Sequence, residues 1–218
     1  VRLTLAYDGT EFRGWAKQGG QRTVEGVLTD ALTRFLGAVP RLSVAGRTDA
    51  GVHARAQVAS FAAPADTVDL TRLQRSVNTM LSPEVVVTEA RWMSNGFDAR
   101  FSATAREYRY RIDVGRWSDP FEARFVWSRP RELSVGAMRA AARHLVGEHD
   151  FSAFSRRAGE GTSNVRRLQR LATSNLPGLR LSGTQYLLVA QKPAHAAPAA
   201  WPAWPARPPS CRALPGKR

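Results

Sequence analysis

The stretch GRTDAGVHA, residues 46–54, places a guanidinium, a hydroxyl, a carboxylate and an imidazole in one short segment. Residues 42–45 before it are mostly apolar, which is typical of the end of a strand. The residues after it alternate, with Val52, Ala54, Ala56, Val58 and Ser60 on one face and His53, Arg55 and Gln57 on the other. A period of two predicts a half-buried strand. We therefore expect a strand–loop–strand junction with Asp49 at the middle of the loop.

This loop has two interpretations when its residues are taken alone. In the first, it is a hairpin turn in which Arg47 and Asp49 form a surface ion pair, which would contribute little to stability. In the second, Asp49 is a functional carboxylate, because a loop on a rigid scaffold can present a side chain to a ligand. Gly46 and Gly51 allow turns and close backbone approach that other residues resist.

Around this junction, the pattern of apolar residues predicts two helices and further strands. Residues 24–36 show helical spacing, with Thr23 as a candidate N-cap and Gly37 as a stop signal, and residues 70–80 repeat the spacing. Residues 2–7 and 85–93 are predicted strands. The resulting order, β-α-β-β-α-β, is a split βαβ arrangement. Phe12 and Trp15 are either core anchors or residues beside a cleft.

A weaker copy of this unit follows. Residues 105–114 predict a strand, residues 134–146 predict a helix that Ser134 caps, and residues 165–173 predict another strand. We therefore expect two related halves with a cleft between them. The expected division is 1–98 for an N-terminal subdomain with the Asp49 loop, 99–190 for an incomplete C-terminal subdomain, and 191–218 for a disordered tail rich in Pro, Ala, Trp and Arg.

The composition favours a polyanionic partner. The formal net charge is +14, and Arg and Lys contacts to phosphate supply most of the affinity in nucleic-acid binding. A solubilising surface, or a genome that favours Arg codons, would also produce this charge. The lone cysteine, Cys211, excludes an intramolecular disulfide and suits a reducing cytoplasm. We expect no membrane association, because no apolar run is long enough to span a bilayer.

The motif at residues 46–54 resembles the active-site motif of the tRNA pseudouridine synthases of the TruA type. Four further segments resemble that family in the same order: YDGTEFRGW at 7–15, TVEGVL at 23–28, ARFSATAREYRY at 99–110 and GEHDF at 147–151. The resemblance runs from Arg2 to about Arg170. It implies an α+β pseudouridine synthase fold, with two related split-βαβ (ferredoxin/RNP-like) halves and antiparallel sheets around a central basic cleft.

The resemblance also implies a reaction, the isomerisation of uridine to pseudouridine in the anticodon stem-loop of tRNA. Asp49 is the expected nucleophile, since a carboxylate can hold an intermediate covalently and then leave. Arg47 is its expected counter-ion, because a neighbouring guanidinium favours the ionised carboxylate. Tyr108 matches the tyrosine that the family places under the target base, where it can stack and serve proton transfer. Tyr110 is more readily interpreted as a core tyrosine.

The expected substrate-binding residues are Tyr108, Arg13, His53, Arg100 and Arg106. The implied reaction needs no metal or organic cofactor, and the histidines do not have metal-ligand spacing. The family implies a homodimer that acts on tRNA in the cytoplasm, with no membrane and no DNA as partner.

The resemblance breaks near residue 185, where the family has a helix that opens on F-L-x-x-M-V-R. In this chain Tyr186 and Leu187 stand at the place of F-L, and Lys192 at the place of the arginine. Lysine replaces a bidentate guanidinium poorly, and Pro193 would stop a helix. A shifted reading frame is one hypothesis for this change.

Two other functions therefore compete with the enzyme. A non-catalytic tRNA- or RNA-binding remnant of such an enzyme is supported by the missing arginine motif. A DNA-binding regulator has only the positive charge in its favour.

Overall fold

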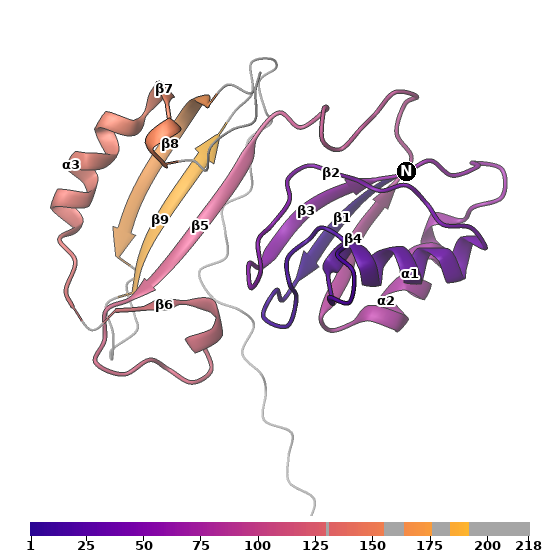
Figure 1. Cartoon of the computed structure of the whole chain (residues 1–218), viewed down its shortest axis with the longest axis horizontal. Coiled ribbons are helices and arrows are strands. Elements are labelled where there is room, and N and C mark those ends of the chain that lie inside the picture. The colour runs from indigo at the N-terminus through magenta and orange to yellow at the C-terminus, as the bar shows by residue number, and fades with distance from the viewer. Residues whose placement is uncertain (130, 155–163, 176–183, 192–218) are drawn as a thin grey trace, which may run out of the picture.

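The computed structural model describes residues 1–129, 131–154, 164–175 and 184–191. Its elements form two units, each built on one β-sheet (Figure 1). The expected α+β class with antiparallel sheets is confirmed. The expected tail at 191–218 lies outside the described residues apart from Gln191.

The N-terminal unit contains a four-stranded sheet of order β2-β3-β1-β4. All neighbouring strands in it are antiparallel. Its elements are β1 (Arg2–Tyr7), α1 (Val24–Leu36), β2 (Ser43–Val44), β3 (Ala54–Ser60), α2 (Leu70–Leu81) and β4 (Val85–Arg91). The segments that the sequence predicts as helices at 24–36 and 70–80 are helices in the structure.

Local capping explains where these helices begin and end. The Thr23 hydroxyl accepts a hydrogen bond from the Gly26 amide at 3.2 Å, and Gly37 ends α1 in a left-handed conformation with φ of 72°. The Asp69 carboxylate accepts from the first free amides of α2, at Thr71 and Arg72. These side chains satisfy backbone groups that have no partner inside a helix.

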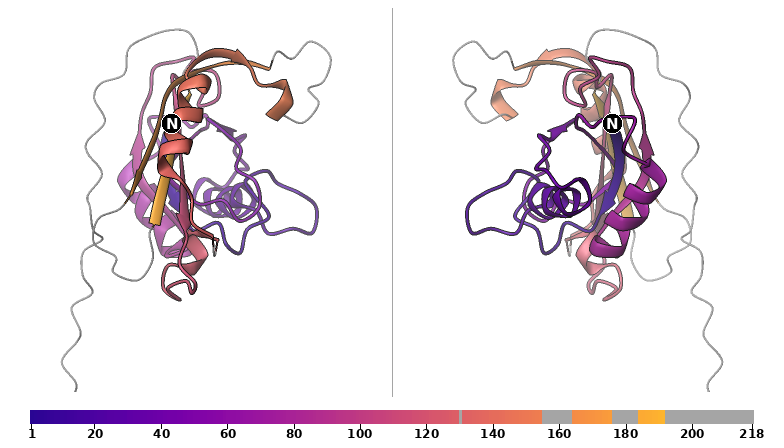
Figure 2. Two further views of the ribbon diagram at one scale, coloured as in Figure 1. Left: turned by 90° about the vertical axis from the view of Figure 1, so that its left-hand side faces the viewer. Right: turned by 90° about the vertical axis from the view of Figure 1, so that its right-hand side faces the viewer.

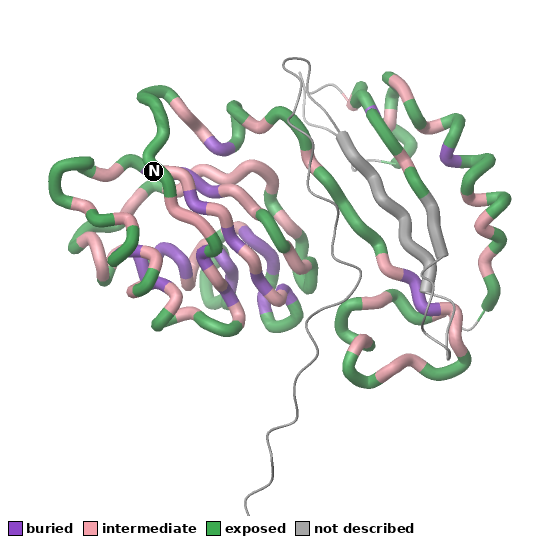
Figure 3. The backbone as a smooth tube through the Cα atoms, turned by 180° about the vertical axis from the view of Figure 1, so that it is seen from behind, coloured by how far each residue is buried: buried purple, intermediate pink, exposed green. Residues whose placement is uncertain are grey.

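The main hydrophobic core lies between the sheet and helices of the N-terminal unit. Figure 3 shows most of the buried backbone there, and green, exposed residues along much of β5. Leu3 and Leu5 of β1, Leu28 and Leu32 of α1, and Leu73 of α2 are fully buried. This core gives the loops at the edge of the sheet a rigid support.

The C-terminal unit contains a five-stranded sheet of order β6-β5-β9-β8-β7, in which only the pairing of β5 with β6 is parallel. Its elements are β5 (Arg106–Asp113), the 3₁₀ helix η1 (Ala123–Phe125), β6 (Trp127–Ser128), α3 (Val135–Leu145), β7 (Gly147–Asp150), the 3₁₀ helix η2 (Ser152–Phe154), β8 (Val165–Asn175) and β9 (Thr184–Gln191). In the turned views of Figure 2, the segment around β7 and η2 projects away from the rest of this unit.

Three local expectations need correction. The segment compared with the family's helix-opening motif, which includes Tyr186 and Leu187, forms strand β9, because it completes the backbone pairing of both β5 and β8. Lys192 lies outside the described residues. Tyr110 is 56% exposed rather than in a core. Gln57 is half-buried, because it bonds to groups of the Asp49 loop and β1.

Candidate functional site

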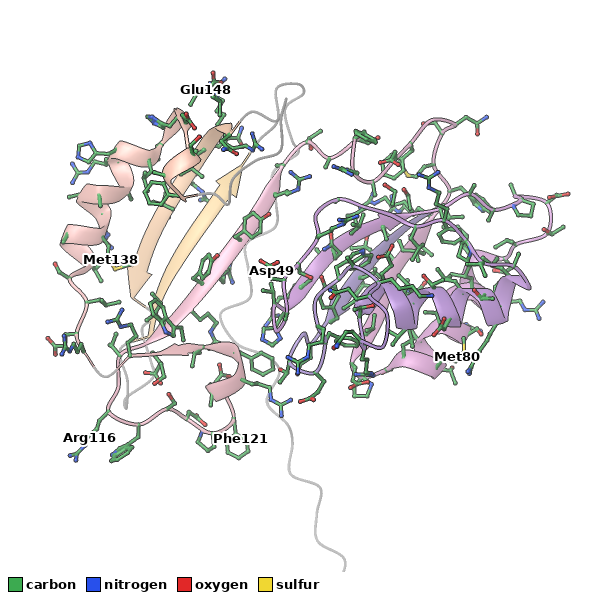
Figure 4. The ribbon with its side chains drawn as sticks, in the orientation of Figure 1. Asp49, Met80, Arg116, Phe121, Met138 and Glu148 are labelled. Atoms are coloured by element: carbon green, nitrogen blue, oxygen red, sulfur yellow. The ribbon has the colours of Figure 1, made fainter. Side chains whose placement is uncertain are left out.

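The Asp49 loop, residues 46–54, connects the β2 region to β3 at the edge of the first sheet. A tight turn shapes it, in which the Val52 amide donates to the Asp49 carbonyl at 3.2 Å and Gly51 has φ of 77°. Because of this turn, β3 begins at Ala54 and not at Val52, where the alternating pattern begins. Asp49 is exposed, and Figure 4 shows it on the side of the N-terminal unit that faces β5.

The segment 9–15 supports this loop from beneath by close backbone contact. A Cβ at Gly9 would lie 2.1 Å from the Val52 carbonyl oxygen, and one at Gly14 would lie 2.8 Å from the Thr48 carbonyl oxygen. The Trp15 amide donates to that Thr48 oxygen at 2.9 Å. Only glycine can occupy positions where another backbone approaches so closely.

Phe12 and Trp15 anchor the supporting segment in the core. Their side chains are 2% and 1% exposed, so both rings are core anchors, and Trp15 also lies beside the groove described below. Their backbone nevertheless belongs to the site, because the Gly51 amide donates to the Phe12 carbonyl at 3.2 Å. Burial of the two rings thus fixes the height of the loop above the core.

A hydrogen-bonded network that the sequence analysis missed holds the first part of the loop. The Tyr7 and Thr48 hydroxyls are 2.8 Å apart. The Gln57 side-chain amide donates to the Gly46 carbonyl at 2.6 Å and to the Tyr7 hydroxyl at 3.3 Å. Burial raises the pKa of Tyr7 above its ordinary value, although the hydrogen bonds with Thr48 and Gln57 act in the opposite direction. No local pattern marked Gln57, because its partners are distant in sequence.

Two contacts join the loop to the C-terminal unit, one at each end. At the first end, the Arg106 guanidinium from β5 donates to the Ala45 carbonyl, through Nε at 2.9 Å and also through Nη2. At the second end, His53 Nε2 lies 3.1 Å from the Arg124 carbonyl, and the His53 ring lies against Phe125 with centroids 4.9 Å apart.

Asp8 completes the second contact. Its carboxylate lies 3.0 Å from His53 Nδ1 and 3.2 Å from the Arg124 guanidinium, and the Thr10 hydroxyl donates to it at 2.6 Å. Burial acts to raise the pKa of Asp8, but the hydrogen bonds from Thr10 and Arg124 and the charge of His53 together lower the pKa below its ordinary value. The ionised carboxylate is therefore the form that this contact stabilises.

A groove of about 1340 Å³ runs beside the loop. Arg47, Arg100, Arg106 and Tyr108 line it, so the fold brings together four side chains that the sequence analysis selected. Lys17 and Arg41 add positive charge to the same walls. Two acidic side chains also line it, and both accept hydrogen bonds from protein groups: Glu25 from the Lys17 amide and Asp98 from Ser43.

The other selected residues lie outside the lining of this groove. Asp49, Arg13 and His53 are not among its lining residues. Arg13, Arg47 and Asp49 are exposed, and in the described chain no ion pair within 4.0 Å joins Arg47 to Asp49. The counter-ion role of Arg47 stays a prediction. Tyr108 is 43% exposed, which leaves part of its ring accessible to a ligand.

Two other kinds of site are absent from the part of the chain that the structure describes. Among the described residues, no cluster of three or more His, Cys, Asp or Glu side chains could hold a metal ion. Within the same residues, no helix has the length and apolar character needed to cross a membrane.

Comparisons with known proteins point to one family. A family model described as tRNA pseudouridine synthase matches residues 141–190. The tRNA pseudouridine synthase A of Frankia casuarinae is 51% identical over 180 residues, covering 81% of this chain and 65% of the relative. The protein of the same name from Fervidobacterium nodosum is 35% identical, covering 86% of this chain and 78% of the relative. That of Myxococcus xanthus is 38% identical, covering 86% and 72%. The chain thus spans about two thirds of the length of the curated relatives it matches.

A methyl group at residue 9 tests the support beneath the loop. We expect Gly9→Ala to displace the 48–52 backbone, because its Cβ would meet the Val52 carbonyl oxygen at 2.1 Å. The amides of Gly51 and Val52 should then exchange hydrogen for deuterium at least ten times faster, because their hydrogen bonds are part of the displaced turn. Gly19→Ala is the matched control, since nothing lies within 4 Å of its Cβ. Equal exchange in both variants would contradict the close-contact argument.

The lowered pKa of Asp8 predicts an acid-dependent contribution to stability. A carboxyl whose folded pKa lies below the unfolded value stabilises the protein above the unfolded pKa, near 3.8, and loses this effect as pH falls through the folded pKa. We expect Asp8→Asn to unfold at a lower urea concentration than the unsubstituted chain at pH 7, with a free energy of unfolding lower by up to about 1 kcal/mol. This difference should shrink as the pH falls below the ordinary carboxyl pKa near 3.8. Asp66→Asn, at an exposed carboxylate, is the control and should unfold at the same urea concentration as the unsubstituted chain at pH 7.

Proposed function

The chain belongs to the tRNA pseudouridine synthase A family, and on this premise we propose that it isomerises uridine to pseudouridine in tRNA. The observation that carries the proposal is the Asp49 loop itself, held by close contact at Gly9 and Gly14 beside a groove lined by Tyr108 and arginines. The anticodon stem-loop is the proposed target, on the basis of the resemblance in the family motifs.

The proposed reaction uses Asp49 as its nucleophile. The C1′–N1 glycosidic bond of the uridine breaks, the uracil turns, a bond forms between C5 and C1′, and the proton on C5 passes to N1 through a base. A carboxylate can stabilise the intermediate by bonding covalently at C1′, or at C6 of the base, and then leaving. Exposure of Asp49 at the start of the turn supports this role, because the target base must come to it from outside the helical stack.

Tyr108 is the proposed platform for the target base. It lies on β5, two residues from Arg106, on the wall of the groove opposite the first sheet. Its partly exposed ring can stack on uracil, and its hydroxyl can take part in proton transfer at C5. Stacking on an aromatic ring is worth ~1–3 kcal/mol per base.

The groove is the proposed path of the tRNA backbone. Arg47 and Arg100 on its wall, and Arg13 outside its lining, are exposed, so their guanidinium groups are accessible to phosphate. Arg47 is also the proposed counter-ion of Asp49. His53 and Arg106, selected as substrate-binding residues, already make hydrogen bonds to protein groups. The Gly9 amide donates to His53 Nδ1 at 3.0 Å, and the contacts of His53 Nε2 and of Arg106 are those described above.

The finer points of fold and context are proposals as well. We propose that the two units are related halves around a basic cleft. The support is the antiparallel sheet in each and the cationic lining of the groove between β2 and β5. By family resemblance, the protein is proposed to act as a homodimer in the cytoplasm.

Removal of the Asp49 carboxylate tests the function directly. We expect purified protein to form pseudouridine in an unmodified tRNA transcript, and Asp49→Asn to form at least 10³-fold less, because an amide cannot replace the nucleophile. Asp66→Asn should keep the activity, since that carboxylate lies in the loop before α2, away from the Asp49 loop. Product is measured by mass spectrometry after chemical derivatisation.

The alternatives give distinct results in the same assay. Bound tRNA without product from the unsubstituted chain would favour a non-catalytic RNA-binding protein. Tighter binding of duplex DNA than of tRNA would favour a DNA-binding regulator.

Two substitutions at Tyr108 separate stacking from proton transfer. Tyr108→Phe keeps the ring, so we expect kcat to fall by about 10² or more with little change in tRNA affinity. Tyr108→Leu removes the ring as well, so tRNA affinity should fall by about 10-fold or more. Tyr110→Leu is the control, because Tyr110 has the same strand and a similar exposure. Equal activity in Tyr108→Phe and the unsubstituted chain would remove the hydroxyl from the mechanism.

A further inference from the structure

The Arg106 side chain crosses from the C-terminal unit to the backbone that leads into the Asp49 loop. Two of its N–H groups, on Nε and Nη2, donate to the carbonyl oxygen of Ala45. This oxygen belongs to the residue immediately before the loop. The contact spans a sequence separation of 61 residues, so it joins two elements that the chain itself does not hold together.

Gly46 makes room for this contact. A Cβ at residue 46 would lie 3.0 Å from Arg106 Nε and 3.4 Å from its Cδ, so any larger side chain would crowd the guanidinium. The Gly46 carbonyl accepts the 2.6 Å hydrogen bond from Gln57. The backbone at 45–46 is therefore held from two sides, by Arg106 from the second sheet and by Gln57 from the first.

Arg106 and Tyr108 share one face of a well-supported strand. Residues two apart in a strand point to the same side of the sheet, and both residues line the groove. β5 pairs with β9 along its whole length, from Arg106 to Asp113, and with β6 at Ile112 and Asp113. The Arg106–Ala45 contact is thus one of the two contacts that place Tyr108 relative to the Asp49 loop, and the one on the same strand as Tyr108.

We infer that Arg106 is a positioning residue for the isomerisation, which fixes the Asp49 loop against Tyr108 through the Ala45 carbonyl, and that tRNA phosphate is not its partner. The inference rests on the proposed function. A phosphate ligand would compete for the same N–H groups, since Nε and one Nη form the side of the guanidinium that binds oxygens in a bidentate manner. The half-buried Arg106 already uses that side within the protein.

The test compares Arg106→Gln and Arg106→Lys with two other arginine variants. For Arg106→Gln we expect kcat to fall by about 10²-fold, because small errors in the position of reacting groups have effects of this size. The Kd for tRNA and the slope of log Kd against log salt should stay unchanged. Arg106→Lys should recover part of kcat, since its ammonium can reach a carbonyl but cannot offer the paired donors. Gly46→Ala should reproduce the loss of kcat with the same unchanged salt slope.

Two control variants show how loss of a phosphate contact would change the Kd for tRNA and its salt dependence. Arg100→Gln, at an exposed arginine in the same groove, should weaken tRNA binding and reduce the salt slope by about 1. Arg34→Gln, on the exposed face of α1, should change neither kcat nor Kd. An Arg106→Gln variant that weakens binding, reduces the salt slope and keeps kcat would overturn the inference, as would one that changes nothing.

Amide hydrogen exchange measures whether Arg106 holds the Asp49 loop even in protein that forms no pseudouridine. We expect the Gly51 and Val52 amides of Arg106→Gln to exchange faster than in the unsubstituted chain, and those of Arg34→Gln to stay unchanged. If the unsubstituted chain forms no pseudouridine and Arg106→Gln still accelerates this exchange, the proposed function fails while Arg106 keeps its role in holding the loop. Unchanged exchange in Arg106→Gln overturns that role in either case.

Discussion

The backbone of residues 9–15 and the backbone of residues 48–52 are so close that a Cβ at Gly9 would meet the Val52 carbonyl oxygen at 2.1 Å. This close approach holds the Asp49 loop in place. Only at this separation can the Trp15 amide donate to the Thr48 carbonyl and the Gly51 amide donate to the Phe12 carbonyl. The rings of Phe12 and Trp15 are buried in the core below. A carboxylate at the surface is thereby tied, through two glycines, to the best-packed part of the molecule.

The two units hold their parts of the site by different means. The N-terminal unit has a continuous core of aliphatic side chains from β1, α1 and α2, so burial fixes the Asp49 loop. Leaving aside residues 173–175 and β9, whose side chains are not described, the buried apolar residues on the elements of the C-terminal unit are Ile112, Ala142 and Leu168. On β5, backbone pairing with β9 holds Tyr108, which lies opposite Val189. The contacts of Arg106 and His53 join the Asp49 loop, which the core supports, to the unit that carries Tyr108 on β5.

Local signals in the sequence predicted the elements, because caps and periodicity act over a few residues. Thr23 and Gly37 bound α1 where they were expected to, and Ser134 caps α3. Contacts between distant segments could not be predicted this way. Gln57 looked like a solvent-facing strand residue until its partners at Gly46 and Tyr7 were known. The segment of β9 was compared with a helix for the same reason, since its strand pairing depends on β5 and β8.

Charge was the least specific of these signals, because residue type alone does not say what an arginine binds. Arg100 and Arg106 line one groove, a few residues apart in sequence. The first is exposed, whereas the second is half-buried with its guanidinium on a backbone carbonyl. An exposed guanidinium keeps its donors for a polyanion, and one that already satisfies a carbonyl would have to leave it unpaired in order to bind phosphate. The net charge of +14 therefore includes arginines with different roles. Arg100 has an accessible guanidinium, whereas the guanidinium of Arg106 is bound to a backbone carbonyl.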